Sequence, residues 1–224
     1  MPDKTFFLTL FRNVSEFMLA LHYWRAAPSY VHDEMARAEI AVALLSLTPD
    51  CTQVTSFQLR AAMCNNPIRG EPGGMDGLAL SDLYPRLVAP PSGLCVCGGL
   101  LGPLRPSYYC RRTLITINHD AVPCLCYEAT CVSDTCGLVT TASYMFESGD
   151  ATARRTGAEH NYREYKTAVS FVDRPYFVAS RFYVFEAGFF PLHMVDLERT
   201  SLSAQALEEM VVLKQPHKKH HVSA

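Results

Sequence analysis

The residues best suited to chemistry in this sequence are its nine cysteines. Two close pairs stand out, "CVC" and "CLC", and a further cysteine follows the second pair. Thiolates bind zinc tetrahedrally, and structural zinc sites commonly combine two close pairs from separate loops. The spacing therefore predicts zinc as a cofactor, held by some of five residues: Cys95, Cys97, Cys124, Cys126 and Cys131.

Other interpretations of the cysteines remain open. The one-residue gap in each pair is tighter than the usual spacer of about two to four residues, so Cys110, His119 or Cys136 could replace any member. Free cysteine is also among the most buried residue types, and these thiols could pack in the core without a metal. Because six of the last seven cysteines lie in segments with Gly, Pro or Asp, where a buried strand is least expected, the sequence favours the metal site.

No motif typical of an enzyme accompanies the thiols. A nucleophilic cysteine needs a positioned histidine, and the candidates Cys136 and His160 lie in no known catalytic motif. The stretch "GEPGGMDG" lacks the lysine, strand and helix of a phosphate-binding loop. We therefore predict that the protein is not an enzyme. A cysteine-dependent hydrolase stays open as the alternative.

The charge of the chain argues against a broad surface for nucleic acid or anionic membrane, since the formal net charge is −2. No apolar segment approaches the roughly 20 residues of a membrane span, and the N-terminal stretch lacks the features of a signal peptide. We therefore expect reduced thiols and a place in cytosol or nucleus. The basic pairs Arg111–Arg112 and Arg154–Arg155 leave open a second class, a zinc-stabilised regulator that binds nucleic acid.

The elements that must position these residues change in type along the chain. Apolar residues at three- and four-residue steps predict helices over residues 5–24 and 33–47, and ten Pro or Gly residues indicate a connection over 65–93. Beyond it, β-branched and aromatic runs such as "TLITI", "GLVTTASYMF", "KTAVSFV" and "YFVASRFYVF" predict strands. A last helix is predicted over 203–213.

These elements predict an α+β fold in which N-terminal helices precede a mainly antiparallel, Cys-rich sheet stapled by zinc. The expected parts are a helical part (1–64), a Pro/Gly-rich connection (65–93), a Cys-rich β part with a terminal helix (94–214) and a polar tail (215–224). With 49% hydrophobic residues, the chain has enough apolar material for a sizeable core in one domain or at most two, and we expect one compact domain.

Short motifs occur in a fixed order between residues 46 and 213. They are "SLTPDCTQVTSFQLRAAMC", "CVC", "CLCYEATC", "GLVTTASYMFESGD", "YREYKTAVSF", "YFVASRFYVFEAG" and "LEEMVVL". In this order of motifs the chain resembles the adenovirus early-region-4 34-kilodalton protein family. Proteins of that family are not enzymes; they act with a viral 55-kilodalton early protein as the substrate-recruiting part of a cullin-RING ubiquitin ligase.

The resemblance implies that this chain is a viral early regulatory adaptor. Its partners would be elongin B/C, a cullin, the viral 55-kilodalton protein and host substrate proteins, without a membrane. Host defence and DNA-repair proteins would be degraded and export of late viral mRNA favoured, in the host nucleus and partly in the cytoplasm.

The resemblance also implies an elongin-binding box, which in the family is a short helix. Its residues here are Ser46, Leu47, Cys51 and Val54, although Thr55 stands at the position that the family gives to an aliphatic residue. A helix would place Leu47 and Cys51 one turn apart, so that both could enter one apolar groove.

Pro49 leaves an alternative open within the box. Proline suits the first turn of a helix that Thr48 would cap, and Leu47 would then lie outside that helix. Cys51 and Val54 would in that case belong to the core.

Overall fold

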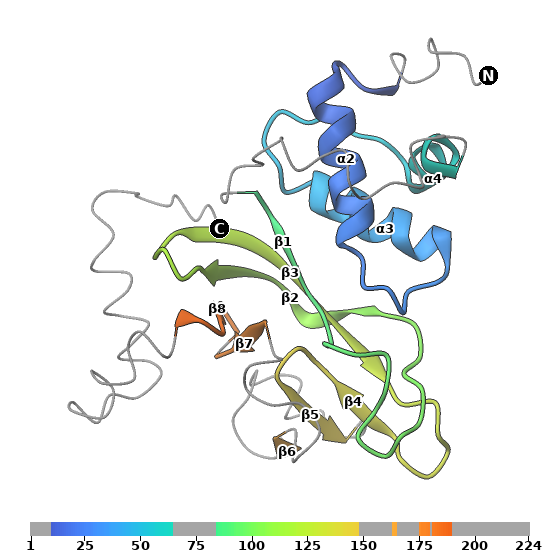
Figure 1. Ribbon diagram of the computed structural model, residues 1–224, viewed down its shortest axis with the longest axis vertical. Helices are drawn as coiled ribbons and strands as arrows, with labels where there is room; N and C mark the ends of the chain where they lie inside the picture. Colours follow the sequence, from blue (N-terminus) through green and yellow to red (C-terminus); the bar gives the residue numbers. More distant parts are fainter. Residues whose placement is uncertain (1–9, 65–83, 148–162, 165–174, 180, 190–224) are drawn as a thin grey trace.

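Helices from the first part of the chain lie at one end of the molecule, and a curled sheet extends from them to the other end (Figure 1). The computed structural model describes residues 10–64, 84–147, 163–164, 175–179 and 181–189. Helices precede strands along the chain, which confirms the predicted α+β class. The predicted helix at 203–213, the tail at 215–224 and the run "KTAVSFV" lie outside the described residues.

The described helices are α2 (Val14–Ala26), α3 (Glu34–Leu45) and α4 (Ser56–Cys64). α2 begins at Val14 because the side chain of Asn13 accepts a hydrogen bond from the N–H of Glu16 (2.9 Å). α3 begins in the same way, since the Asp33 carboxylate accepts from the N–H of Met35 (3.0 Å). The predicted helix over 33–47 is thus confirmed as α3, with its end two residues earlier.

α4 is a helix that the sequence analysis did not predict, although its start carries a recognisable signal. The hydroxyl of Thr55 accepts from the N–H of Gln58 (3.3 Å), and the side-chain oxygen of Gln58 accepts from the N–H of Thr55 (2.9 Å). This reciprocal capping box satisfies two backbone donors at the start of the helix.

The strands form one eight-stranded sheet in the order β6-β5-β4-β3-β2-β8-β7, with β1 also paired to β3. Their bounds are β1 (Arg86–Val88), β2 (Arg105–Ile115), β3 (Ala121–Thr130), β4 (Leu138–Thr140), β5 (Tyr144–Glu147), β6 (Arg163–Glu164), β7 (Tyr176–Val178) and β8 (Tyr183–Glu186). β1 lies within the stretch 65–93 that the sequence analysis interpreted as a connection.

The sheet is mixed, which corrects the prediction of a mainly antiparallel sheet. β1 runs parallel to β3, with Leu87 opposite Leu125, and β2 runs parallel to β8, with Leu114 opposite Val184. A parallel neighbour needs a crossover connection rather than a hairpin. The composition of the strands does not reveal which of them meet, so the direction of pairing could not be predicted.

Alternation along the central strands divides the core between the two faces of the sheet. Leu87 and Leu125 pack against the helices, whereas Val88, Cys124 and Cys126 belong to a separate apolar cluster. Successive side chains of a strand point to opposite faces, so this division follows directly from the sequence of β1 and β3. In the part of the chain that the structure describes, no helix is both long and apolar enough to cross a membrane.

A buried carboxylate ties α2 to the segment that follows α3. Glu16 accepts hydrogen bonds from the backbone N–H of Thr52, from the Thr52 hydroxyl (2.9 Å) and from the backbone N–H of Arg12 (2.7 Å). Burial raises the pKa of the Glu16 carboxyl, but the hydrogen bonds from Thr52 and Arg12 outweigh this effect and hold the pKa below its usual value.

We expect Glu16→Gln to lower the free energy of unfolding by about 1–3 kcal/mol at neutral pH, because a charged acceptor of three hydrogen bonds is lost. The depressed pKa means that this stabilisation is complete above the unfolded-state pKa of about 4.3 and is lost as the pH falls through the lower folded-state pKa. Urea denaturation at about pH 7 and about pH 3 should therefore show the difference between native and variant shrinking at acid pH. If the variant and the native protein differed in free energy of unfolding by the same amount at both pH values, this role of the charge would be contradicted. An equal loss of stability in the exposed control Glu39→Gln would contradict it as well.

Candidate metal centre

Four cysteine thiols meet at the end of the sheet that lies away from α2. The Sγ atoms of Cys95, Cys97, Cys131 and Cys136 all lie within 4.8 Å of one another. In two of the pairs, Cys95 with Cys136 and Cys97 with Cys131, the Sγ atoms lie 3.6 Å apart. A tetrahedral ion with metal–sulfur bonds of about 2.3 Å holds its sulfurs about 3.8 Å apart. The four thiols therefore have the spacing of a tetrahedral metal site.

Cys95 and Cys97 lie on a tight turn that follows β1. The N–H of Gly98 donates to the carbonyl of Cys95 (2.9 Å), and the N–H of Cys95 donates to the carbonyl of Gly99 (2.8 Å). Gly98 has a φ of 83°, a left-handed conformation that favours glycine. A Cβ on Gly99 would lie 3.1 Å from the Sγ of Cys131, so glycine at this position leaves room for the thiols.

Cys131 and Cys136 lie on the loop between β3 and β4. The N–H of Cys131 donates to the carbonyl of Leu138 (2.8 Å), and the N–H of Cys136 donates to the carbonyl of Ser133 (3.0 Å). Gly137, directly after Cys136, has a φ of 58°. Both loops thus place a left-handed glycine immediately after a cysteine, which lets the backbone turn around the sulfur.

Backbone contacts hold the two loops together independently of the thiols. The N–H of Gly102 donates to the carbonyl of Thr130 (2.8 Å), and the N–H of Val132 donates to the carbonyl of Leu100 (3.0 Å). Figure 1 shows the loop after β1 (green) beside the loop between β3 and β4 (yellow-green). The first loop is also anchored to the helical part, where the Tyr30 hydroxyl donates to the carbonyl of Pro90 (2.6 Å).

The environment of the thiols suits a cation. The N–H of Gly99 and the neighbouring thiols lower the pKa of Cys97 to about 7, whereas burial raises the pKa of Cys95 to about 12 and also raises that of Cys131. Four thiolates packed this closely repel one another, and a bound cation reverses the effect by favouring deprotonation of each ligand. Thiolate ligands select soft ions such as zinc over calcium or magnesium.

The structure joins three of the predicted ligands, Cys95, Cys97 and Cys131, and adds Cys136 as the fourth. It does not bring Cys124 and Cys126 to this group, because both lie inside β3 on the face opposite the helices. The Cys124 thiol donates to that of Cys126, and this contact together with burial holds the pKa of Cys124 well above its usual range. These two cysteines are core residues, as the alternative interpretation of the cysteines allowed.

The other residues that could have replaced a predicted zinc ligand also lie outside the group of four thiols. Cys110 is half-buried in β2 and packs against the core beneath the helices. His119 stands in the turn after β2 with a φ of 64°, and its ring contacts that of Phe189 at 5.4 Å between centroids. His160, the partner that a nucleophilic Cys136 would need, lies outside the described residues, as do Arg154 and Arg155.

The four residues of the elongin-type box do not form a helix, which corrects the expected helical box. Ser46 caps the end of α3, and the chain from Leu47 to Val54 consists of turns up to Asp50, whose φ is 61°, and of irregular backbone after it. Pro49 has no N–H to donate and disfavours helical backbone at Thr48, so α3 does not continue through the box. Val54 is buried, while Leu47 and Cys51 are half-buried and pack against the core.

Comparison of the chain with protein-family models, with curated proteins and with solved structures finds no match.

Proposed function

We propose that this protein is a zinc-stabilised adaptor that binds other proteins and catalyses no reaction. The observation that carries the proposal is the meeting of the four thiols of Cys95, Cys97, Cys131 and Cys136. A site with four cysteine ligands leaves no open position for a water or a substrate, which is the arrangement of structural rather than catalytic zinc. Zinc would fix the loop after β1 to the loop between β3 and β4.

The loops that carry the thiols also present apolar side chains to solvent, which supports binding of a protein partner. Leu94 is 54% exposed, Leu100 64% and Val132 59%. Leu94 and Leu100 lie on a groove of about 580 Å³ whose other wall includes Tyr30 and Ala36 of the helical part. Clustered exposed apolar residues commonly mark sites where proteins associate.

Native mass spectrometry of the intact, freshly purified chain tests the zinc assignment. We expect one zinc ion per chain, lost on treatment with a strong chelator and regained when zinc is added back. A protein that is purified without metal and takes up no added zinc would contradict the assignment.

A more specific form of the adaptor rests on the resemblance to the adenovirus early proteins. In it the chain recruits an elongin B/C and cullin ubiquitin ligase together with a viral 55-kilodalton partner, in the host nucleus and partly in the cytoplasm. Leu47 and Cys51 keep part of their surface exposed, so both could still contact elongin C, now from a turn rather than from a helix. Val54 is too buried to take part.

Affinity purification of the tagged chain from host cells, followed by mass spectrometry, tests this form. Elongins and a cullin should be retained by the native chain and lost from the Leu47→Ala/Cys51→Ala variant. The matched control is Val14→Ala/Phe57→Ala, because both side chains are apolar, highly exposed and on the same helical part. Elongins absent from the native sample, or equally retained by both variants, would exclude the ligase form and leave the zinc measurement unaffected.

A further inference from the structure

β2 contains a bulge that carries two tyrosines out of the regular pairing. Pro106 pairs with Tyr127 and Arg111 pairs with Leu125, so four residues of β2 stand opposite one residue of β3. Bulges re-aim side chains and are frequent at functional sites. Tyr108, at the centre of this bulge, is 63% exposed.

Contacts within the bulge keep it ordered. The buried Arg112 donates from its Nε to the carbonyl of Tyr109 (2.9 Å), and the Ser107 hydroxyl donates to the same carbonyl (3.2 Å). The rings of Tyr108 and Tyr109 meet edge to face with centroids 4.8 Å apart. Tyr108 is therefore held as a rigid aromatic platform on the surface.

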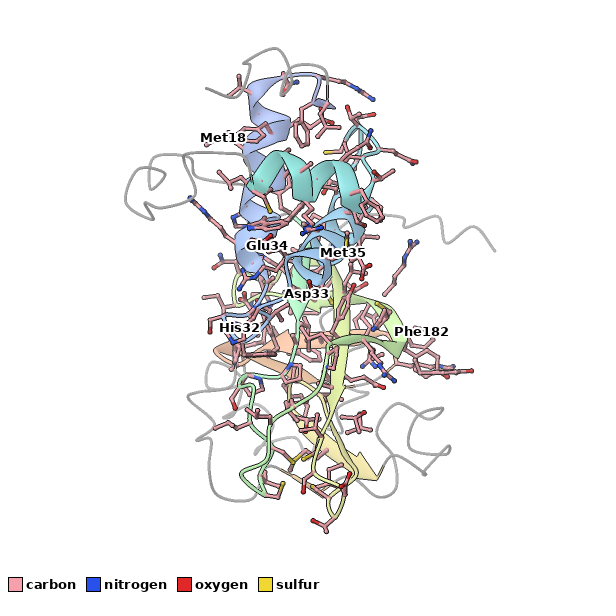
Figure 2. The ribbon with its side chains drawn as sticks, turned by 90° about the vertical axis from the view of Figure 1, so that its right-hand side faces the viewer. Met18, His32, Asp33, Glu34, Met35 and Phe182 are labelled. Atoms are coloured by element: carbon pink, nitrogen blue, oxygen red, sulfur yellow. The ribbon has the colours of Figure 1, made fainter. Side chains whose placement is uncertain are left out.

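The turn before β8 brings a second exposed aromatic residue beside β2. The N–H of Thr113 donates to the carbonyl of Phe182 (2.8 Å), next to the parallel pair of Thr113 and Tyr183. Phe182 is 55% exposed, and the guanidinium of Arg181 lies 4.6 Å from its ring centroid. Figure 2 shows Phe182 at the outside of the molecule, at the level of the sheet.

Two exposed arginines accompany the two rings. Arg111 in β2 and Arg181 in the turn before β8 each stand two residues before the pair of Thr113 and Tyr183, and the hydrogen bond from Thr113 to Phe182 brings this turn against β2. We define these residues as the basic–aromatic strip, which consists of Tyr108, Arg111, Arg181 and Phe182.

We propose that the basic–aromatic strip binds single-stranded nucleic acid. Unpaired bases stack on exposed aromatic rings with little regard to sequence, and arginines beside the rings bind the phosphates between those bases. The strip joins both features on two adjoining segments, β2 and the turn before β8, and its positive charge complements a polyanion despite the net charge of −2 for the chain. This surface is separate from the thiol group and from Leu47 and Cys51, so the proposal does not depend on the adaptor function.

Fluorescence anisotropy with the full, zinc-supplemented chain tests the proposal. The probes are a labelled oligouridylate and a labelled oligothymidylate of about 12 nucleotides, each compared with a duplex of the same length. We expect both single strands to bind more tightly than the duplex, and Tyr108→Ala or Phe182→Ala to weaken binding about ten-fold or more. Tyr108→Phe and Phe182→Tyr, which keep a ring, should retain binding.

The salt dependence tests the arginines separately. We expect each arginine to contact one phosphate. Replacing both, in Arg111→Ala/Arg181→Ala, should therefore make the negative slope of log affinity against log salt concentration less steep by about 1.4. The control pair Arg25→Ala/Arg60→Ala should keep the native slope, and Phe57→Ala should keep the native affinity. Lack of binding at low salt, equal binding of duplex, or an equal effect of Phe57→Ala and the strip variants would overturn the proposal.

Discussion

Replacing Cys131 by Ser is expected to weaken zinc binding by more than about 100-fold. Serine offers no soft thiolate, so the ion would lose one of four ligands and with it the link between the two loops. The free energy of metal binding adds to the free energy of folding, and the midpoint of thermal unfolding should fall as well. Competition with a chromophoric zinc chelator measures the first effect, and differential scanning calorimetry measures the second.

Cys124→Ala is the matched control for that experiment. Its side chain is fully buried in the apolar cluster on the far face of β3, and we expect native zinc affinity with a loss of about 1 kcal/mol of stability. Cys126→Ala should behave in the same way. If zinc were lost from Cys124→Ala and retained by Cys131→Ser, the four-thiol centre would be wrong and the pair predicted from the sequence would be favoured.

Phe185→Ala is expected to lower the free energy of unfolding by about 3–5 kcal/mol, the usual cost of emptying a buried aromatic site. Phe185 has no exposed surface, lies in β8 and packs against Ile115 and Phe189, whose ring centroid is 5.1 Å away. Urea denaturation measures the loss.

Phe182→Ala provides the control for Phe185→Ala, since the same residue type stands three positions earlier and is 55% exposed. We expect a change of less than about 0.5 kcal/mol. Similar losses in both variants would show that the two side chains are not placed as described. The same control establishes that weaker nucleic-acid binding by Phe182→Ala does not come from unfolding.

Local signals in the sequence predicted the helical part only in part, since residues 11–13, inside the predicted helix over 5–24, are not helical and α2 begins at Val14. The acidic cap at Asp33 and the apolar spacing that follows it identified α3 within two residues of its end. The conformation of the box that begins at Ser46 was harder to predict. Its motif is defined by residue types, whereas its backbone conformation is set by Pro49 and by Asp50, which has a left-handed φ. The same local reading missed α4, whose Thr55 and Gln58 capping box is a usable signal.

The metal ligands could be predicted only in part, because β3 resembles a loop in its sequence. Pro123 and the two cysteines after it suggested a turn, yet Pro123 pairs with β2 just before the residues that also pair with β1. The informative signal was the glycine directly after Cys97 and after Cys136, since each takes up a left-handed conformation. The approach of the two loops depends on long-range pairing, which spacing along the chain does not encode.

The parallel pairing of β2 with β8 has a consequence for how the chain folds. Thr113 can pair with Tyr183 only after the residues of β3 to β7 have been synthesised. Val178 and Val184 then cover the apolar side chains of Leu114 and Val122. Contacts between such distant parts of a chain slow folding. During synthesis on the ribosome, the helices and β1 to β3 emerge first, and one edge of β2 stays unpaired until β8 has emerged. That interval is when the new chain is most exposed to aggregation, and also when a chaperone has the longest time to bind it.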